Sequence, residues 1–237
     1  GVSLINVQVY QIDCKIYLMK DVNLTNILEE ISHFIDLGLV QNEKMLKFHE
    51  RRGYKNYVHS GFNELEKSKV YKEGKIYSFS IRTIDKELKD YLSNVLRDIS
   101  TVTMKGLVTT VKCIQKKYIE KLYTLTATLL KSEKGYWKGN IGFDAYEKRL
   151  IDNSIKKAKM VLGEDFNEDF ALYNSIRMLN YKPISNRFKN ISLLGDKLEL
   201  TIADNDRAQQ VAYILLGTGI LENNSRGYGY VNYKSGY

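Results

Sequence analysis

Residues 4–19 read LINVQVYQIDCKIYLM, and apolar and polar residues alternate along this stretch. A period of two is typical of a β-strand with one buried face. The apolar positions change phase between Val9 and Ile12, which indicates a bulge or a bend in the strand. A pattern of period 3.6 follows from Leu24 to Ile35 and predicts a helix capped by Asn23. The stretch therefore predicts a strand followed directly by a helix.

The patterns that follow complete a unit of six elements. Further strands are predicted over 56–60, 75–83 and 101–113, and a second helix opens after Asp85. A basic loop is expected around His49, between the first helix and the second strand. The first half of the chain therefore has the order β-α-β-β-α-β.

The second half repeats this order with additions. Strand patterns cover 118–130, 191–194, 197–202 and 227–233, and helix patterns cover 144–162, 166–179 and a last helix from a cap at Asp204 to Leu216. Gly195 and Asp196 suit a two-residue hairpin turn between the second and third of these strands. The fold class is therefore predicted to be α+β, with two tandem ferredoxin-like (RRM-like) domains, each an antiparallel sheet with helices on one face. We expect domains over 1–114 and 115–237. Pro183 is the only proline, so the usual composition of a linker is missing, and we expect the two domains to pack directly on each other.

Composition excludes several classes of protein. The chain has 237 residues, of which 43% are hydrophobic and 27% charged, as in ordinary globular proteins. The apolar runs are far shorter than the ~20 residues of a membrane span, and residues 1–20 lack the pattern of an export signal. Cys14 and Cys113 lie in different strands and are expected to be free buried thiols. These features predict a cytoplasmic protein with no membrane partner.

The charge balance favours a polyanionic partner. There are 36 Lys and Arg against 28 Asp and Glu, which gives a net charge of +8, and 18 Tyr and 8 Phe accompany them. Cations bind phosphates and aromatic rings stack on bases, so this combination suits nucleic acid. A solvated basic surface with the aromatic rings in the core is the alternative.

One segment carries the groups needed for phosphodiester chemistry. Residues 47–57, KFHERRGYKNY, place His49 among four cations and two phenols. Histidine titrates near neutral pH and can move a proton, while a cation offsets charge that grows on a phosphoryl group. RNA supplies its own nucleophile, the ribose 2′-OH, so this equipment needs no metal or cofactor. Of the other two histidines, His33 is expected to be exposed and His59 to be structural.

A glycine-rich segment lies near the end of the second half. Residues 216–230 read LGTGILENNSRGYGY, and close glycines let a backbone bend sharply and approach a phosphate. The segment lacks the lysine of a P-loop and follows a helix where a dinucleotide-binding turn would precede one. On its own it could equally be a structural loop.

These two segments together resemble a known family. The string Glu222 to Gly229, ENNSRGYG, is similar to the C-terminal glycine-rich loop of the CRISPR-associated endoribonucleases that process precursor CRISPR RNA, the Cas-six family. Residues 48–60, FHERRGYKNYVHS, resemble that family's catalytic-histidine segment. Layout, length and charge also match the family.

The resemblance implies metal-independent cleavage in the repeats of a long CRISPR transcript by 2′-OH attack, which leaves a 2′,3′-cyclic phosphate and a 5′-OH. It gives His49 the role of general acid or base and Lys55 that of the transition-state cation. The third role is open among His33, Tyr54 and Tyr57, because the first predicted helix holds no tyrosine; we take Tyr57. Candidate RNA-binding residues are Arg51, Arg52, Tyr54, Lys156, Lys157, Gly219, Asn224, Ser225, Arg226, Gly227 and Gly229.

The register of the glycine-rich segment is open at this stage. If Gly219 is the family's first glycine, Leu221 replaces the next one; otherwise Gly217 and Gly219 form the pair.

The partner implied by the resemblance is single-stranded or hairpin CRISPR repeat RNA, with other CRISPR effector subunits or a second copy of the chain as further candidates. The main alternative function is a non-catalytic RNA-binding scaffold of a CRISPR ribonucleoprotein complex. A basic structural or DNA-binding protein is the third.

Overall fold

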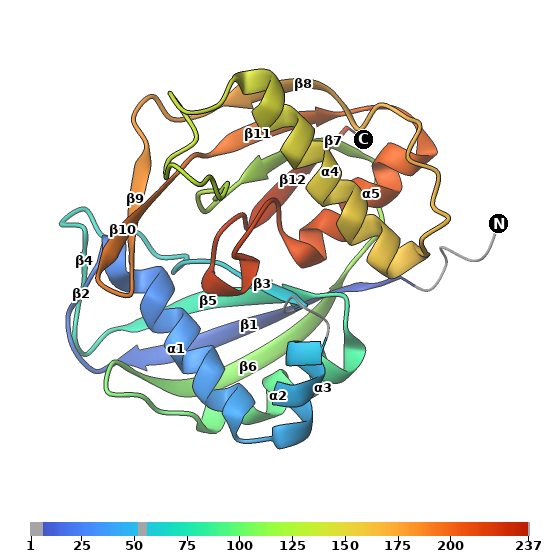
Figure 1. Ribbon diagram of the computed structural model, residues 1–237. Helices are drawn as coiled ribbons and strands as arrows, with labels where there is room; N and C mark the ends of the chain where they lie inside the picture. Colours follow the sequence, from blue (N-terminus) through green and yellow to red (C-terminus); the bar gives the residue numbers. More distant parts are fainter. Residues whose placement is uncertain (1–6, 52–55, 237) are drawn as a thin grey trace.

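The computed structural model describes residues 7–51 and 56–236, and for residues 48–51 it describes the backbone alone. Two four-stranded antiparallel sheets lie one above the other in Figure 1, each built from one half of the chain. No helix in the described ranges is both long enough and apolar enough to cross a membrane.

The first half forms a ferredoxin-like unit. Its sheet has the order β3-β5-β1-β6, so the first and last strands are antiparallel neighbours at its centre and edge. The core lies between this sheet and the helices, where Phe34 of α1 meets Phe79 of β5 edge-on. The strands are β1 (Val9–Leu18), β3 (Tyr57–His59), β5 (Ile76–Thr83) and β6 (Met104–Ile114), and the helices are α1 (Ile27–Val40), α2 (Glu43–Arg51) and α3 (Lys86–Val95). Short elements are β2 (Val22–Asn23), β4 (Val70–Tyr71), η2 (Leu24–Asn26) and η3 (Leu96–Asp98).

The second half repeats the topology. Its sheet has the order β12-β7-β11-β8. This matches the first sheet read from its other edge, β6-β1-β5-β3, strand for strand. The strands are β7 (Ile119–Thr124), β8 (Tyr173–Met178), β11 (Leu198–Ile202) and β12 (Val231–Ser235), and the helices are α4 (Phe143–Leu162) and α5 (Asp206–Thr218). A hairpin of β9 (Ile184–Phe188) and β10 (Ile191–Gly195) is inserted between β8 and β11, and η4 (Asn224–Arg226) precedes β12. The structure thus confirms the predicted α+β fold of two tandem ferredoxin-like halves.

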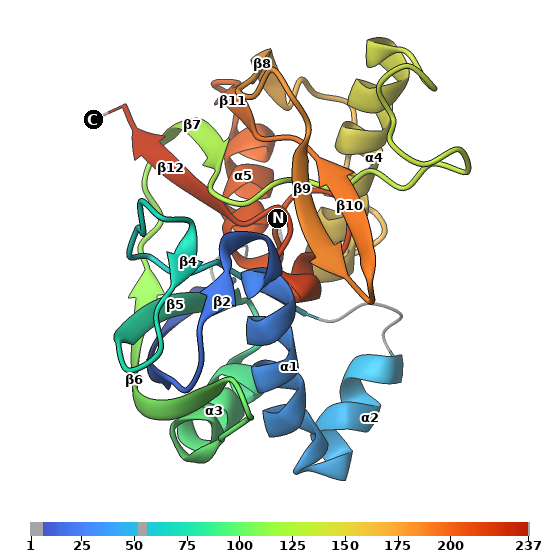
Figure 2. The same cartoon turned by 90° about the vertical axis from the view of Figure 1, so that its left-hand side faces the viewer.

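The halves pack directly on each other, as the sequence predicts. The Tyr213 hydroxyl of α5 donates to the Ile114 carbonyl and accepts from the Val9 amide, which ties α5 to the neighbouring strands β6 and β1 of the first sheet. Arg82 of β5 donates to the Val231 carbonyl of β12 and lies over the Tyr230 ring. The inserted hairpin also crosses from the second half to α1, as Figure 2 shows, where the Lys189 amide donates to Glu29.

Two predictions in the second half are wrong. Residues 166–179 are not a helix, because Tyr173–Met178 pairs with β11 as an edge strand. The hairpin turn is at Lys189 and Asn190, both with positive φ, and not at Gly195 and Asp196. Asp196 is instead buried, and its carboxylate accepts from the Tyr136 hydroxyl, the Trp137 indole and the Asn180 amide.

Three details of the helices and cysteines also differ from prediction. Asn23 makes no side-chain cap, and α1 begins at Ile27 after a 3₁₀ turn. Asn205, one residue after the predicted cap Asp204, caps α5 by accepting from the Ala208 amide. Cys14 is buried as predicted, whereas Cys113 is exposed on the edge strand β6; both are free.

Candidate functional site

The segment expected to be a basic loop is a helix as far as Arg51. The Asn42 side chain accepts from the amides of Lys44 and Met45, which starts α2, and buried Met45 anchors it. His49 therefore lies in the last turn of α2 and not in a loop. The side chains of His49 and Arg51, and all of Arg52, Tyr54 and Lys55, lie outside the described part of the structure.

Tyr57, on the far side of this segment, is fully enclosed. It pairs with Thr83 in the first sheet and its side chain has 0% exposure. Burial raises the pKa of its phenol, and the nearby Asp36 carboxylate raises it further. The phenol does not reach the surface, so its burial does not favour the catalytic role predicted for Tyr57, which stays a prediction.

The other two histidines take different positions. His33 is exposed on α1, as predicted. His59 is buried, with Nδ1 2.8 Å from the Ser60 carbonyl oxygen and Nε2 2.9 Å from the Ser32 hydroxyl. A carbonyl can only accept, so Nδ1 carries the proton and Nε2 accepts from Ser32. Burial lowers the pKa of His59 to about 4, and the neutral ring has the structural role predicted for it.

The glycine-rich segment begins inside α5 and then turns repeatedly. Gly217 is helical and packs against Val9 and Ile84, while Gly219 and Leu221 have φ values of +80° and +59°. Glycine adopts positive φ without the penalty that a β-carbon brings. A leucine at positive φ, two residues after Gly219, supports the register in which Leu221 occupies a glycine position.

The end of this segment is seated on the first half. Gly227, with φ +99°, lies so close to the His59 ring that a β-carbon would meet Cε1 at 2.6 Å. Arg226 forms an ion pair with Asp36 of α1 at 2.5 Å and lies near the Phe188 ring of the inserted hairpin. Gly227 is therefore a packing position, and Arg226 is already paired.

The interior of the segment is organised by Asn224. Its side-chain amide donates to the carbonyls of Ile220 and Tyr228, and so connects the two ends of the turn. Its oxygen accepts from the ammonium of Lys157, which also donates to the carbonyls of Gly219 and Leu221. Lys157 is buried beneath the loop and its ammonium is fully hydrogen-bonded there, so its burial does not favour the RNA contact predicted for it. That contact stays a prediction.

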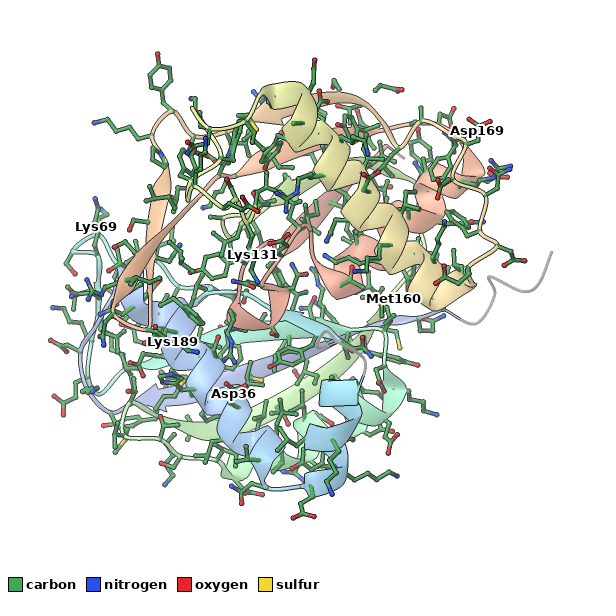
Figure 3. The ribbon with its side chains drawn as sticks, in the orientation of Figure 1. Asp36, Lys69, Lys131, Met160, Asp169 and Lys189 are labelled. Atoms are coloured by element: carbon green, nitrogen blue, oxygen red, sulfur yellow. The ribbon has the colours of Figure 1, made fainter. Side chains whose placement is uncertain are left out.

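A polar cavity of about 480 Å³ lies between α4 and the outer side of this loop. It brings together four residues that the sequence predicts, and adds Lys131 and Asn153, which it does not; the four are Lys156, Lys157, Asn224 and Ser225. Lys131 and Lys156 are exposed cations, and the Asn153 side-chain oxygen is buried with no hydrogen-bond partner among the described residues. Figure 3 shows Lys131 and Met160 on the α4 side and Asp36 on α1 below them. The cavity can therefore bind a phosphate and a hydrogen-bond donor side by side.

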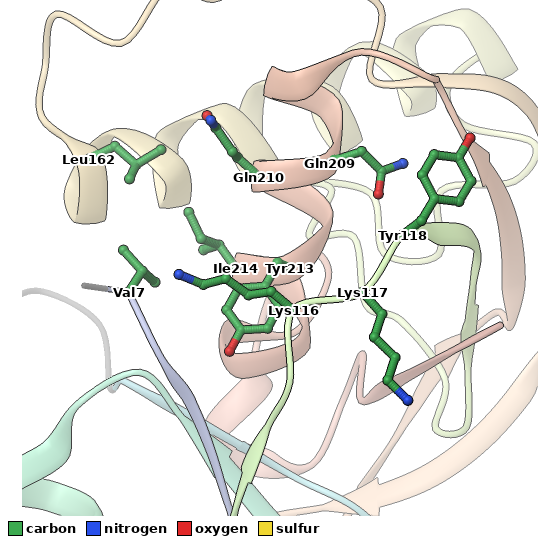
Figure 4. A pocket seen from close by; sticks show the side chains of 9 residues that line it. All are labelled: Val7, Lys116, Lys117, Tyr118, Leu162, Gln209, Gln210, Tyr213 and Ile214. Atoms are coloured by element: carbon green, nitrogen blue, oxygen red, sulfur yellow. The ribbon is translucent and has the colours of Figure 1, made fainter. Parts of the chain in front are cut away.

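A second cavity, of about 460 Å³, is different in character. Figure 4 shows it at the connection between the halves, lined by Val7, Tyr213, Ile214 and neighbouring residues. It is mostly apolar and contains none of the predicted site residues. Within residues 7–51 and 56–236, no group of three His, Cys, Asp or Glu side chains is placed to hold a metal ion.

The fold and the loop define a class of protein: two ferredoxin-like halves with a glycine-rich loop between the last helix and the last strand. No protein-family model matches the chain, and no curated protein matches it.

Solved structures match it over nearly its whole length. One titled "CRISPR associated protein Cas6" is 15% identical with a TM-score of 0.69, and covers 96% of this chain and 100% of its own. An RAMP protein described as binding different RNA substrates is 16% identical with a TM-score of 0.70, at 95% and 100% coverage. The product of a Cas6-related gene from Pyrococcus furiosus is 14% identical with a TM-score of 0.65, at 97% and 100% coverage. The chain therefore has the fold of the Cas6 proteins, which confirms the predicted structural resemblance.

Proposed function

We propose that this protein is a metal-independent endoribonuclease that cleaves precursor CRISPR RNA in its repeats. The observation that carries the proposal is the likeness to a Cas6 structure over 96% of the chain. In this chain the His49 segment lies between α1 and β3, and the glycine-rich loop lies between α5 and β12. The basic net charge and the cavity with Lys131 and Lys156 support RNA as the ligand.

The proposed reaction is a transesterification within the RNA. The 2′-OH before the cut loses its proton and attacks the phosphorus, and the bond to the 5′-oxygen breaks as that oxygen gains a proton. The products are a 2′,3′-cyclic phosphate and a 5′-OH. His49 moves one of these protons, and Lys55 offsets the charge on the phosphoryl oxygens. Burial of Tyr57 leaves His33 and Tyr54 as the better candidates for the third role.

The proposed RNA surface combines side chains with a shaped backbone. Lys156 and Ser225 contribute from the cavity, and Arg51, Arg52 and Tyr54 from the His49 segment. Gly219 and Gly229, both with positive φ, shape the loop from within, and Asn224 holds it together. Repeat RNA is the primary partner, and assembly with other CRISPR effector subunits is compatible with this surface.

A direct test is cleavage of labelled repeat RNA by the pure protein in excess EDTA. We expect a single cut, and products whose ends are a 2′,3′-cyclic phosphate and a 5′-OH. Removal of the cyclic phosphate by phosphatase only after acid treatment identifies that end. RNA that stays intact, or cleavage that requires added magnesium, would contradict the proposal.

A non-catalytic RNA-binding scaffold is the second candidate. It is favoured by the likeness to the RAMP protein described as binding different RNA substrates, and by the burial of Tyr57. In that case the protein would bind repeat RNA tightly and leave it uncut in the same assay.

A further inference from the structure

Lys157 is a buried cation with a complete set of partners. Its side chain rises from α4 beneath the glycine-rich loop, and the residue is 6% exposed. The ammonium lies 2.9 Å from the Gly219 carbonyl oxygen, 2.7 Å from that of Leu221 and 2.8 Å from the Asn224 side-chain oxygen. An ammonium has three protons to donate, so each is used once.

All three acceptors belong to one turn of the loop. Gly219 and Leu221 follow the end of α5 at positive φ, where their carbonyls have left the helical hydrogen-bond pattern. Buried carbonyls need partners, and Lys157 provides them. Asn224, held by the same ammonium, donates to Ile220 and Tyr228 on the two limbs of the turn. One cation therefore connects α4 to both limbs of the loop.

The charge itself needs an explanation, because burying a cation is costly. The carboxylate that acts on Lys157 is that of Glu222, but Glu222 is paired with Arg149 at 3.1 Å and also accepts from the Lys131 amide. Neutral oxygens therefore surround the ammonium, and burial lowers the pKa of Lys157 to about 7. An apolar side chain of similar length would avoid the cost of a buried charge but would leave three oxygens of the loop without this donor, so the cation is explained by the loop conformation that it specifies.

We propose that Lys157 is a positioning residue whose ammonium holds the glycine-rich loop in one conformation and so presents the outer side of the loop, with Asn223 and Ser225, to RNA. The inference rests on the proposed function and deepens it. A loop already held in one conformation loses little conformational entropy when RNA binds, so its affinity for RNA is higher than that of a mobile loop. Lys157 also lines the cavity, but its three donors are used within the loop, so in this proposal it acts through the loop and not by contact with a phosphate.

The neighbouring Lys156 provides a matched control. Lys156 is exposed on the same helix and lines the cavity, so Lys156→Met removes the same charge from a position that can contact phosphate. For Lys157→Met we expect the Kd for repeat RNA to rise about tenfold, with kcat at saturating RNA within about threefold of wild type and the salt dependence of Kd unchanged. For Lys156→Met we expect the slope of log Kd against log salt to fall by about 0.7, the value for one phosphate contact on a single strand.

Amide hydrogen exchange tests the same role without RNA. In Lys157→Met the loop amides at Ile220, Gly227 and Gly229 should exchange at least tenfold faster, while amides in the middle of α4 and α5 keep their protection. In Lys156→Met no loop amide should change. This arm gives a result even if the protein proves not to bind RNA, so failure of the inference and failure of the proposed function can be told apart.

The wild-type protein provides an arm that needs no variant. The carboxylate that acts on the ammonium, that of Glu222, is paired with Arg149. Loop protection, corrected for intrinsic exchange, should fall between about pH 6 and about pH 8.5 as Lys157 loses its proton. Unchanged loop protection in both Lys157→Met and the wild-type titration would overturn the inference, and so would a salt slope in Lys157→Met that falls as in Lys156→Met.

Discussion

His59 shows how one buried side chain supports the loop from the first half. Its ring is neutral, accepts from Ser32, and forms the surface against which Gly227 packs. The folded protein binds a proton at His59 with a pKa of about 4, whereas the unfolded chain binds it near pH 6.5. Protonation therefore favours the unfolded chain as pH falls from 6.5 towards 4.

This difference predicts a pH dependence of stability. Between pH 6.5 and pH 5 the free energy of unfolding should fall by about 1.5 kcal/mol because of His59 alone. Urea unfolding at the two pH values measures the change, and His59→Gln should reduce it by that amount. His33→Ala, which alters an exposed histidine, is the control and should leave the change as it is in wild type. An equal fall in wild type and His59→Gln would contradict a buried neutral ring.

His49 carries the catalytic part of the proposal. We expect His49→Ala to slow cleavage of repeat RNA by about a hundredfold or more, because proton transfer by a positioned side chain contributes that much. RNA affinity should stay close to wild type. Single-turnover cleavage and filter binding measure the two effects, and a variant that cuts at the wild-type rate would remove His49 from the mechanism.

The candidate residues differ in how far the sequence predicts their surroundings. Lys156, Lys157 and Ser225 line one cavity, a meeting that the sequence does not predict, and Lys157 is buried as well. A signal for this was present, since Lys157 follows Tyr146 and Leu150 at helical spacing, on the stripe that faces the core. The burial of Tyr57 had no such signal, because a three-residue strand is too short to show a period.

At the scale of elements, α2 decides where His49 lies. The side chain of Asn42 accepts from two amides of the first turn, and replacing such a cap costs about 1 kcal/mol. A loss of this size lowers the ratio of formed to unformed helix by about fivefold.

We therefore expect Asn42→Ala to speed amide exchange in α2 by about fivefold, and to slow cleavage by no more than that factor, because cleavage follows the fraction of formed helix. Asn42→Asp keeps the cap and should behave as wild type. If Asn42→Ala exchanged like wild type in α2, the cap would not be what holds the His49 helix.

Each element that the sequence mispredicts has its own physical cause. The cap at Asn42 is masked in the sequence because basic residues dominate the segment after it. Tyr173–Met178 is a strand because it pairs with β11, a contact between positions far apart in the sequence. The turn at Lys189 and Asn190 has positive φ at both residues without a glycine, so the usual marker of such a turn is missing. Local pattern predicts elements well only where local preference and distant pairing agree.

At the scale of the whole molecule, the order of elements was enough to predict the architecture. Two β-α-β-β-α-β series allow two similar sheets, and the structure has both with matching strand order. The contacts between the halves are harder to predict from the sequence, because Arg82 and Tyr213 bond to partners more than ninety residues away. That packing brings the loop, seated on His59 and Asp36, against α1 and β3 of the first half.

The central claim is that RNA is cut by its own ribose. It is tested most directly with repeat RNA that carries a single 2′-deoxynucleotide before the cut, compared with the all-ribose strand in excess EDTA. We predict that the protein binds both strands with the same affinity and cuts only the all-ribose strand. Cleavage of the 2′-deoxy strand at the same position and rate would contradict the account.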